Sequence, residues 1–176
     1  MVNFINKAFG IKIKTGAICS FEYSEKYYPY IFEVDDGKEY EGTSFDFHIK
    51  DDDTEIYFEI KLTEPGFGKV LKPDIRHQKK AEQYVKYLPA IYKDVTAEMM
   101  LKDYQIFRNI IRARNKNANV IFITDGKNPA TNKDIARFIK RYGPLPVNVK
   151  FFTWQEIASK YPCELPFQLK AVAHDN

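Results

Sequence analysis

Two neighbouring segments with alternating apolar and polar residues constrain the fold of this chain most. Apolar residues occupy every second position of 44–50 (SFDFHIK), and the alternation returns in 55–62 (EIYFEIKL). A period of two is typical of a β-strand with one buried face. The residues between them, 51–54 (DDDT), are polar and turn-forming. The sequence therefore predicts an antiparallel hairpin within 44–64.

The apolar faces restrict which residues of this hairpin lie opposite each other. The apolar set of the first arm is Phe45, Phe47 and Ile49. A slip of one residue would turn these side chains to solvent. With a four-residue loop, Asp46 lies opposite Glu59, with Cβ atoms about 5 Å apart. A two-residue loop would make Asp46 a diagonal neighbour of Glu59, although residues 51–52 lack the glycine that such turns favour. Either register brings two carboxylates together with Lys61.

Two carboxylates at this distance repel each other unless a cation or a proton lies between them. One interpretation is structural: Lys61 forms a surface ion pair with Glu59, worth roughly 0–1 kcal/mol. The other is functional: Asp46 and Glu59 bind a hard divalent cation, and the backbone carbonyl of Ile60 adds a ligand. Lys61 would then position a water molecule or a phosphate oxygen. The spacing alone leaves both interpretations open.

The order of these residues resembles a known signature. An Asp on one strand, followed by Glu-x-Lys on the next, resembles the active site of the PD-(D/E)xK phosphodiesterase superfamily, which includes restriction endonucleases and many repair and recombination nucleases. Asp46, Glu59 and Lys61 match its three positions, and the chain has one Glu-x-Lys. The wider sequences TSFDFHI and YFEIKLTEPGFG are similar to a group of bacterial restriction endonucleases. Phe45 stands where the name of the motif has proline, as in many members.

The resemblance implies a function and a cofactor. It implies a Mg²⁺- or Mn²⁺-dependent endonuclease that hydrolyses DNA, of a restriction or repair type, with the metal held by Asp46, Glu59 and the Ile60 carbonyl. Lys61 would assist the attacking water. The alternative is a catalytically inactive DNA-binding or assembly module with the same fold. The resemblance implies DNA as the partner and leaves open whether the protein forms a homodimer.

The resemblance also suggests auxiliary residues. Superfamily members often carry an extra acid before the first strand; here Glu22 and Glu41 are candidates, and Glu64 lies close after Lys61. Members often carry a glutamine or a basic residue on the helix behind the Glu-x-Lys strand, which points to Gln105 or Arg108. Ordinary solvent exposure is the competing interpretation for all of these.

A basic segment follows the hairpin and is the candidate contact with the DNA backbone. Its members are Lys69, Lys72, Arg76 and Lys79. A solvated charged helix face is the competing interpretation. The net charge of +3 permits nucleic-acid binding without requiring it.

Length and composition favour a single domain over residues 1–176. No apolar run approaches the length of about 18 residues that a membrane span needs. Cys19 and Cys163 are isolated, and we expect ordinary small hydrophobic residues in a reduced, cytoplasmic protein.

The remaining segments predict an α/β (α+β) fold. Short helices or strands are expected at 3–9 (helix), 17–23 and 30–34 (strands), 74–88 and a second segment from Thr96 to Ile111 (helices), 119–124 (strand), 132–142 (helix), 147–153 (strand) and 154–161 (helix). The apolar run 119–124 is typical of a strand covered on both faces. A strand–helix–strand unit implies a parallel pair. We therefore expect a central mixed β-sheet flanked by helices, which matches the αβββαβ core of restriction-endonuclease-like proteins.

Overall fold

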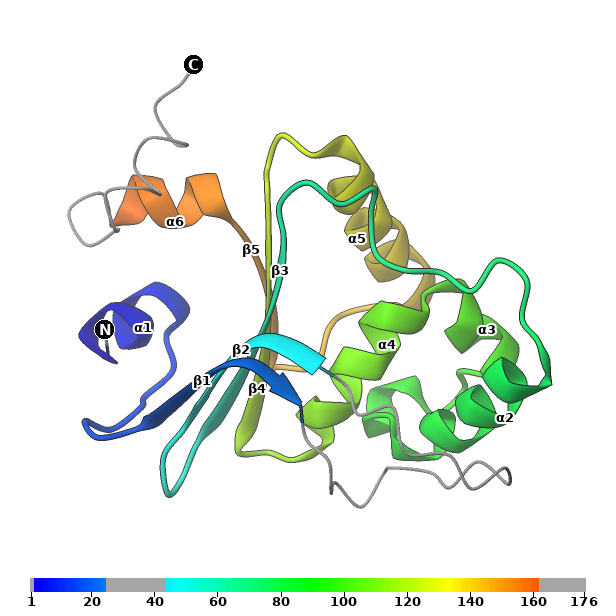
Figure 1. Ribbon diagram of the computed structural model, residues 1–176, viewed down its shortest axis with the longest axis horizontal. Helices are drawn as coiled ribbons and strands as arrows, with labels where there is room; N and C mark the ends of the chain where they lie inside the picture. Colours follow the sequence, from blue (N-terminus) through cyan, green and yellow to red (C-terminus); the bar gives the residue numbers. More distant parts are fainter. Residues whose placement is uncertain (1, 25–43, 162–176) are drawn as a thin grey trace.

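The computed structural model describes residues 2–24 and 44–161, which form a five-stranded sheet with helices on both faces (Figure 1). The strand order is β1-β2-β3-β4-β5. The strands are β1 (Ile18–Ser24), β2 (Ser44–Lys50), β3 (Glu55–Lys61), β4 (Ala118–Thr124) and β5 (Val149–Thr153). The first three strands are antiparallel neighbours, and β3, β4 and β5 run parallel. The predicted mixed sheet is therefore confirmed.

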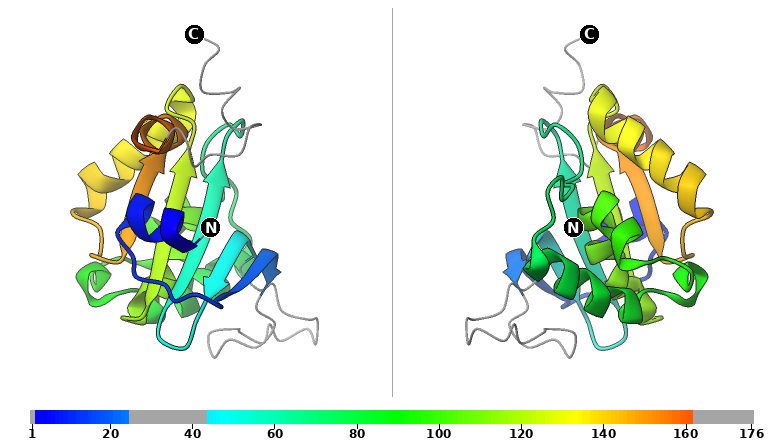
Figure 2. Two further views of the ribbon diagram at one scale, coloured as in Figure 1. Left: turned by 90° about the vertical axis from the view of Figure 1, so that its left-hand side faces the viewer. Right: turned by 90° about the vertical axis from the view of Figure 1, so that its right-hand side faces the viewer.

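The helices divide between the two faces of the sheet (Figures 1 and 2). One face is covered by α1 (Val2–Phe9) and α6 (Trp154–Lys160). The other face is covered by α2 (Ile75–Tyr84), α3 (Ala97–Lys102), α4 (Tyr104–Ile110) and α5 (Pro129–Tyr142), with the short 3₁₀ segments η1 (Val85–Tyr87), η2 (Ala90–Tyr92) and η3 (Ile111–Arg114). Each face of the sheet has its own hydrophobic core, and strand β4 contributes side chains to both. Ile121 packs on the first face and Phe122 on the second.

The hairpin of β2 and β3 forms in the register that a four-residue loop predicts. Lys50 pairs with Glu55, and Phe47 pairs with Phe58. The pairing ends there, so the expected opposition of Asp46 and Glu59 is not part of the ladder. In the described residues, no ladder pair joins β2 and β3 on the N-terminal side of Phe47.

The prediction that Phe45 shares a face with Phe47 is wrong. Phe47 packs against the core that contains Ile49, whereas Phe45 packs against Tyr57 on the opposite face. The change of face coincides with an irregularity in the neighbouring strand, where Glu22 adopts a φ of 47°, a value that non-glycine residues rarely take. The β1–β2 ladder lacks the pair at Glu22, and the alternation of faces changes at this point.

The helix predicted from Thr96 onward is divided into two. Thr96 caps α3 as expected, because its hydroxyl accepts from the N–H of Met99. Asp103 then breaks the helix with φ −134° and ψ 43°. Its side chain is buried and binds Arg137 and Arg141 of α5. The helix break therefore lies at a residue of an ion-pair network, and the apolar periodicity of this segment does not predict it.

Several expectations concern the ends of the chain. The helix predicted at 3–9 is α1, and the chain turns after it at Gly10 with a φ of 63°. The predicted strand at 30–34, Glu41 and Cys163 lie outside the described residues. Cys19 is a free cysteine, as expected for an isolated residue, and it is exposed. Among the described helices, none has the length and apolar character needed to cross a membrane.

Candidate functional site

Glu59 and Lys61 lie at the end of β3, on the face of the sheet that α4 covers. Their neighbours on β4 are Phe122 and Thr124, which pair in parallel register with Glu59 and Lys61 respectively. Glu59 is only 3% exposed. The Nζ atom of Lys61 lies 2.9 Å from Oε1 of Glu59. The hairpin therefore carries a largely buried ion pair, in contrast to the surface pair of the structural interpretation.

Helix α4 contributes a third member to this pair. Nε2 of Gln105 donates a hydrogen bond of 2.6 Å to Oε1 of Glu59. The Oε1 atom of Gln105 accepts from the N–H of Gly68 at 2.9 Å, and the N–H of Gln105 donates to the Gly68 carbonyl at 3.2 Å. Gln105 therefore connects the carboxylate of Glu59 to the loop after β3. The structure brings this helix candidate to the site.

Arg108, the other helix candidate, does not contact the carboxylates through a hydrogen bond that the structure describes. Its guanidinium lies 5.9 Å from the ring centre of Tyr104. Its Nε atom is buried without a hydrogen-bond partner. Burial raises the pKa of Glu59, and the positive charge of Arg108 opposes this rise in part. Arg108 thus acts on the site through charge.

The pKa values of Glu59 and Lys61 are both raised, but by different causes. Burial raises the pKa of Glu59, and the charge of Asp46 adds to this, while Lys61 opposes it without cancelling it. For Lys61, burial lowers the pKa, but the carboxylates of Glu59, Glu64 and Asp46 together raise it above the usual 10.5. Lys61 therefore stays an ammonium at neutral pH.

The side chain of Asp46 is held by a backbone N–H of β3. Its Oδ2 atom accepts a hydrogen bond of 2.6 Å from the N–H of Ile60. The side chain is exposed, and its negative charge raises the pKa of both Glu59 and Lys61. Asp46 therefore acts electrostatically on the Glu59–Lys61 pair although the two strands no longer form a ladder at this point.

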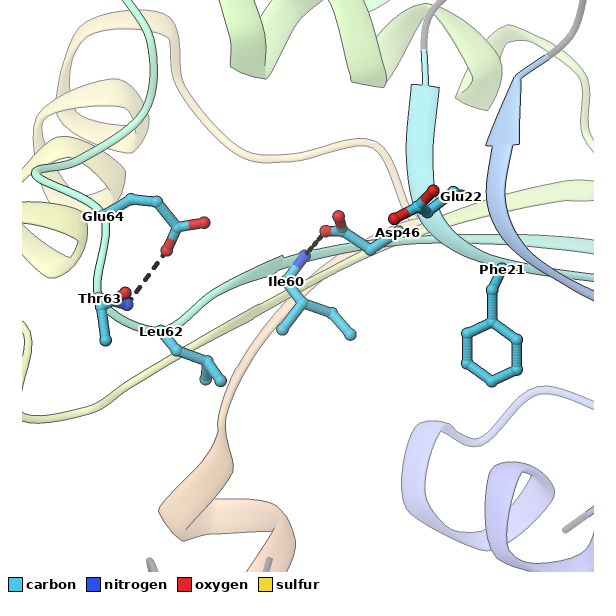
Figure 3. A pocket seen from close by; sticks show the side chains of 7 residues that line it. All are labelled: Phe21, Glu22, Asp46, Ile60, Leu62, Thr63 and Glu64. Atoms are coloured by element: carbon cyan, nitrogen blue, oxygen red, sulfur yellow. Dashed lines mark hydrogen bonds between the residues drawn. The ribbon is translucent and has the colours of Figure 1, made fainter.

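A pocket of about 560 Å³ opens beside Asp46 (Figure 3). It is lined by Phe21, Glu22, Asp46, Ile60, Leu62, Thr63 and Glu64. The auxiliary candidates Glu22 and Glu64 thus share one pocket with Asp46. Oε1 of Glu64 lies 3.6 Å from Nζ of Lys61, and its other carboxylate oxygen accepts from the N–H of Thr63 at 3.1 Å. Phe21 and Leu62 were not predicted from the sequence. Their positions, in an edge strand and directly after the end of β3, are the signal that could have suggested them as pocket residues.

The donor set fits a divalent cation that keeps most of its water. In the described part of the chain, no three carboxylate, histidine or cysteine side chains are grouped closely enough to hold a metal ion. Mg²⁺ prefers one or two carboxylates together with several waters. The carboxylates of Asp46 and Glu59 and the backbone carbonyl of Ile60 are the oxygen donors that would have to supply such a site. Calcium cages with many protein oxygens require a larger set than these residues provide.

The basic segment after the hairpin combines an ion-paired lysine with exposed ones. Nζ of Lys69 lies 3.0 Å from the buried carboxylate of Asp134. Lys69 therefore has an intramolecular partner, and its contact with DNA stays a prediction. Lys72 and Lys79 are exposed. The side chain of Arg76 lies outside the described part of the structure.

These features define an α+β protein of the restriction-endonuclease-like class. A more particular assignment comes from comparison with known families. The chain belongs to the family described as Restriction Endonuclease associating with ARP, which matches residues 5–174. No curated protein and no solved structure shows significant similarity to the chain.

Proposed function

We propose that this protein is a PD-(D/E)xK nuclease that hydrolyses phosphodiester bonds in DNA with the help of Mg²⁺ or Mn²⁺. One observation carries the proposal: in a chain of a restriction endonuclease family, Lys61 lies 2.9 Å from Glu59 and within electrostatic range of Asp46. In the sequence, each of the three matches one position of the superfamily signature.

The protonation state of Lys61 limits its role. Because its pKa is raised, the side chain carries a proton at neutral pH and cannot accept one from water. It can donate hydrogen bonds to the attacking water or to a phosphate oxygen, and its charge stabilises the negative charge that develops on the phosphate. A divalent cation at Asp46 and Glu59 would supply Lewis-acid polarisation of the phosphate and a more acidic bound water.

The contacts around the carboxylates favour a fixed geometry. Gln105 holds one oxygen of Glu59, and the N–H of Ile60 holds one oxygen of Asp46. Groups fixed before the substrate binds cost less reorganisation in the transition state.

A second candidate function is a DNA-binding or assembly module that has lost turnover. The observation that favours it is the burial of Glu59, whose Oε1 atom already accepts from both Lys61 and Gln105. The family description, which names an association with ARP, also supports an assembly role.

Cleavage of supercoiled plasmid with Mg²⁺ separates the two candidates. We expect cleavage by the wild type, and cleavage lower by a factor of about 10² or more for Asp46→Asn or Lys61→Met. Lys116→Met, which changes an exposed lysine outside the site, should cleave like the wild type. Binding of DNA without cleavage by the wild type would favour the second candidate.

A further inference from the structure

Phe21 is an aromatic residue of β1 that faces solvent at the candidate site. Its side chain is 79% exposed, although aromatic rings contribute most when they are buried. It lines the same pocket as Asp46 and Glu22. Large exposed apolar groups beside a polar pocket are typical of ligand-binding surfaces.

The backbone next to Phe21 is strained. Glu22 has a φ of 47°, and the ladder between β1 and β2 is interrupted there. On the far side of this interruption, Tyr23 turns to the other face and stacks on His48 with ring centres 4.0 Å apart. Backbone strain persists where the surrounding structure enforces it, and it occurs often at ligand sites.

The ring of Phe21 contacts the ring of Phe47 on the neighbouring strand. The two ring centres lie 4.8 Å apart, with an angle of 34° between the planes. Phe47 packs against the core of the sheet, so this contact limits the rotation of the Phe21 ring. The result is an exposed ring in a defined orientation.

The pocket has a polar side and an apolar side. Figure 3 shows the carboxylates of Glu22, Asp46 and Glu64 on one side of the β3 edge. The side chains of Phe21 and Leu62 point to the other side of that edge. A nucleotide has the same division, because its phosphate is ionic and its base is a flat ring system.

We propose that Phe21 stacks on a nucleobase of the nucleotide whose phosphate is bound at Asp46, and that the substrate is therefore single-stranded or locally opened DNA. This inference rests on the proposed function. A base inside a duplex is stacked on both faces, so it must leave the stack to reach an exposed ring on the protein. Aromatic stacking of this kind tolerates every base, since each base has a flat face.

Binding of oligonucleotides tests the proposal. DNA that carries the fluorescent base 2-aminopurine is titrated with protein in Ca²⁺, as a single strand and as a duplex. We expect single strands to bind more tightly and the fluorescence to be quenched by the wild type. Phe21→Ala should weaken single-strand binding about 10- to 100-fold, the scale of one base–aromatic stack, and abolish quenching. Phe21→Trp should keep both.

Ile18→Ala is the matched control. Ile18 lies on the same strand and is 70% exposed, but it does not line the pocket. The variant should bind like the wild type. Equal single-strand affinity of Phe21→Ala and wild type, or an equal loss for single strand and duplex, would overturn the proposal. So would a change from dimer to monomer in sedimentation of Phe21→Ala, because a second copy of the chain would then cover the ring.

Plasmid cleavage by the same preparations distinguishes this proposal from the proposed function. If Phe21→Ala and wild type cleave and bind equally, the stacking proposal fails and the nuclease assignment stands. If the wild type quenches 2-aminopurine but does not cleave, the stacking proposal stands and the nuclease assignment fails. If the wild type binds neither form of DNA, both fail.

Discussion

The amide of Gln105 donates a hydrogen bond of 2.6 Å to the carboxylate of Glu59, although the two residues lie 46 positions apart. This contact connects the helix α4 to the strand β3 at the candidate site. Because Glu59 is nearly inaccessible to water, Gln105 replaces part of its hydration. It favours the ionised carboxylate, the form in which Glu59 could bind a metal.

Removal of this donor should change the pH dependence of cleavage. Gln105→Leu leaves the ionised carboxylate with one hydrogen bond fewer, so the pKa of Glu59 should rise beyond its already raised value. The acidic limb of the pH–rate profile should then move to higher pH. Gln78→Leu, an exposed change on α2, is the control and should leave the profile in place. An unshifted limb in Gln105→Leu would show that this contact does not control ionisation at the site.

Glu59→Gln should stabilise the protein at neutral pH. Burial raises the pKa of Glu59 above 4.5, so its ionisation costs folding free energy as the pH rises from 4.5 through the folded pKa. The neutral amide avoids this cost. The melting temperature should therefore exceed that of the wild type at pH 7, and the difference should disappear below about pH 4.5. Thermal melts from pH 4 to 8 measure this, with the exposed Glu82→Gln as control. A difference independent of pH would contradict the explanation.

Local patterns predicted much of the fold because they depend on neighbours in sequence. The period of two in 44–50 and 55–62 predicted the hairpin, and the apolar run at 119–124 predicted the central strand β4. The helix break at Asp103 depends on Arg137, 34 positions away, and no local pattern reports it.

The candidate site was predictable in its residue types but not in its geometry. The sequence brought Asp46, Glu59 and Lys61 to one hairpin. It could not reveal that Asp46 leaves the ladder and binds the N–H of Ile60, since the break lies beside an unusual backbone at Glu22 of the neighbouring strand, which no period of two reports. Nor could it choose between Gln105 and Arg108, because the choice depends on the rotation of α4 against the sheet.

The exposed lysines of the basic segment should affect the salt dependence of DNA binding. Lys72→Glu with Lys79→Glu should weaken binding to all sequences alike and reduce the slope of log K against log salt by about 1 for each phosphate that is no longer neutralised. Titrations at several salt concentrations measure the slope. Lys93→Glu with Lys160→Glu, which changes exposed lysines elsewhere, provides a control with the same change of charge. Equal slopes for the two double variants would place the DNA on another surface.

Arg137 should be essential for stability. It binds Asp134 and Asp103, each at 2.6 Å, and both carboxylates are buried. Arg137→Met would leave both with weaker compensation, and loss of one partner from a buried pair costs about 3–5 kcal/mol. The melting temperature should fall by roughly 2–4 °C per kcal/mol. Denaturant unfolding checks the free energy of unfolding.

Two controls accompany Arg137→Met. Arg137→Lys retains the charge and should recover part of the loss, although it cannot reach both carboxylates with a planar group. Lys133→Met, on an exposed position of the same helix, should be near neutral. A stability of Arg137→Met equal to that of Lys133→Met would mean that the network contributes little.

The role of Lys61 can be separated from its effect on stability. Its pKa is raised above 10.5, so folding favours the ammonium at every pH below that value. Lys61→Met should therefore lower the melting temperature at pH 7, because Glu59 loses its partner, and should lower cleavage by a factor of about 10² or more, the scale for one electrostatic stabiliser.

The double variant Lys61→Met with Glu59→Gln decides whether this lost activity is only lost stability. It contains neither the unpaired carboxylate nor the ammonium, so its melting temperature should recover toward that of the wild type. If Lys61 acts in the reaction, cleavage stays absent in the recovered protein. The single variant Lys61→Arg, which keeps the charge on a longer group, should retain more stability than Lys61→Met. Plasmid cleavage and thermal melts of the same preparations measure both quantities, and cleavage by Lys61→Met at the rate of the wild type would remove Lys61 from the mechanism.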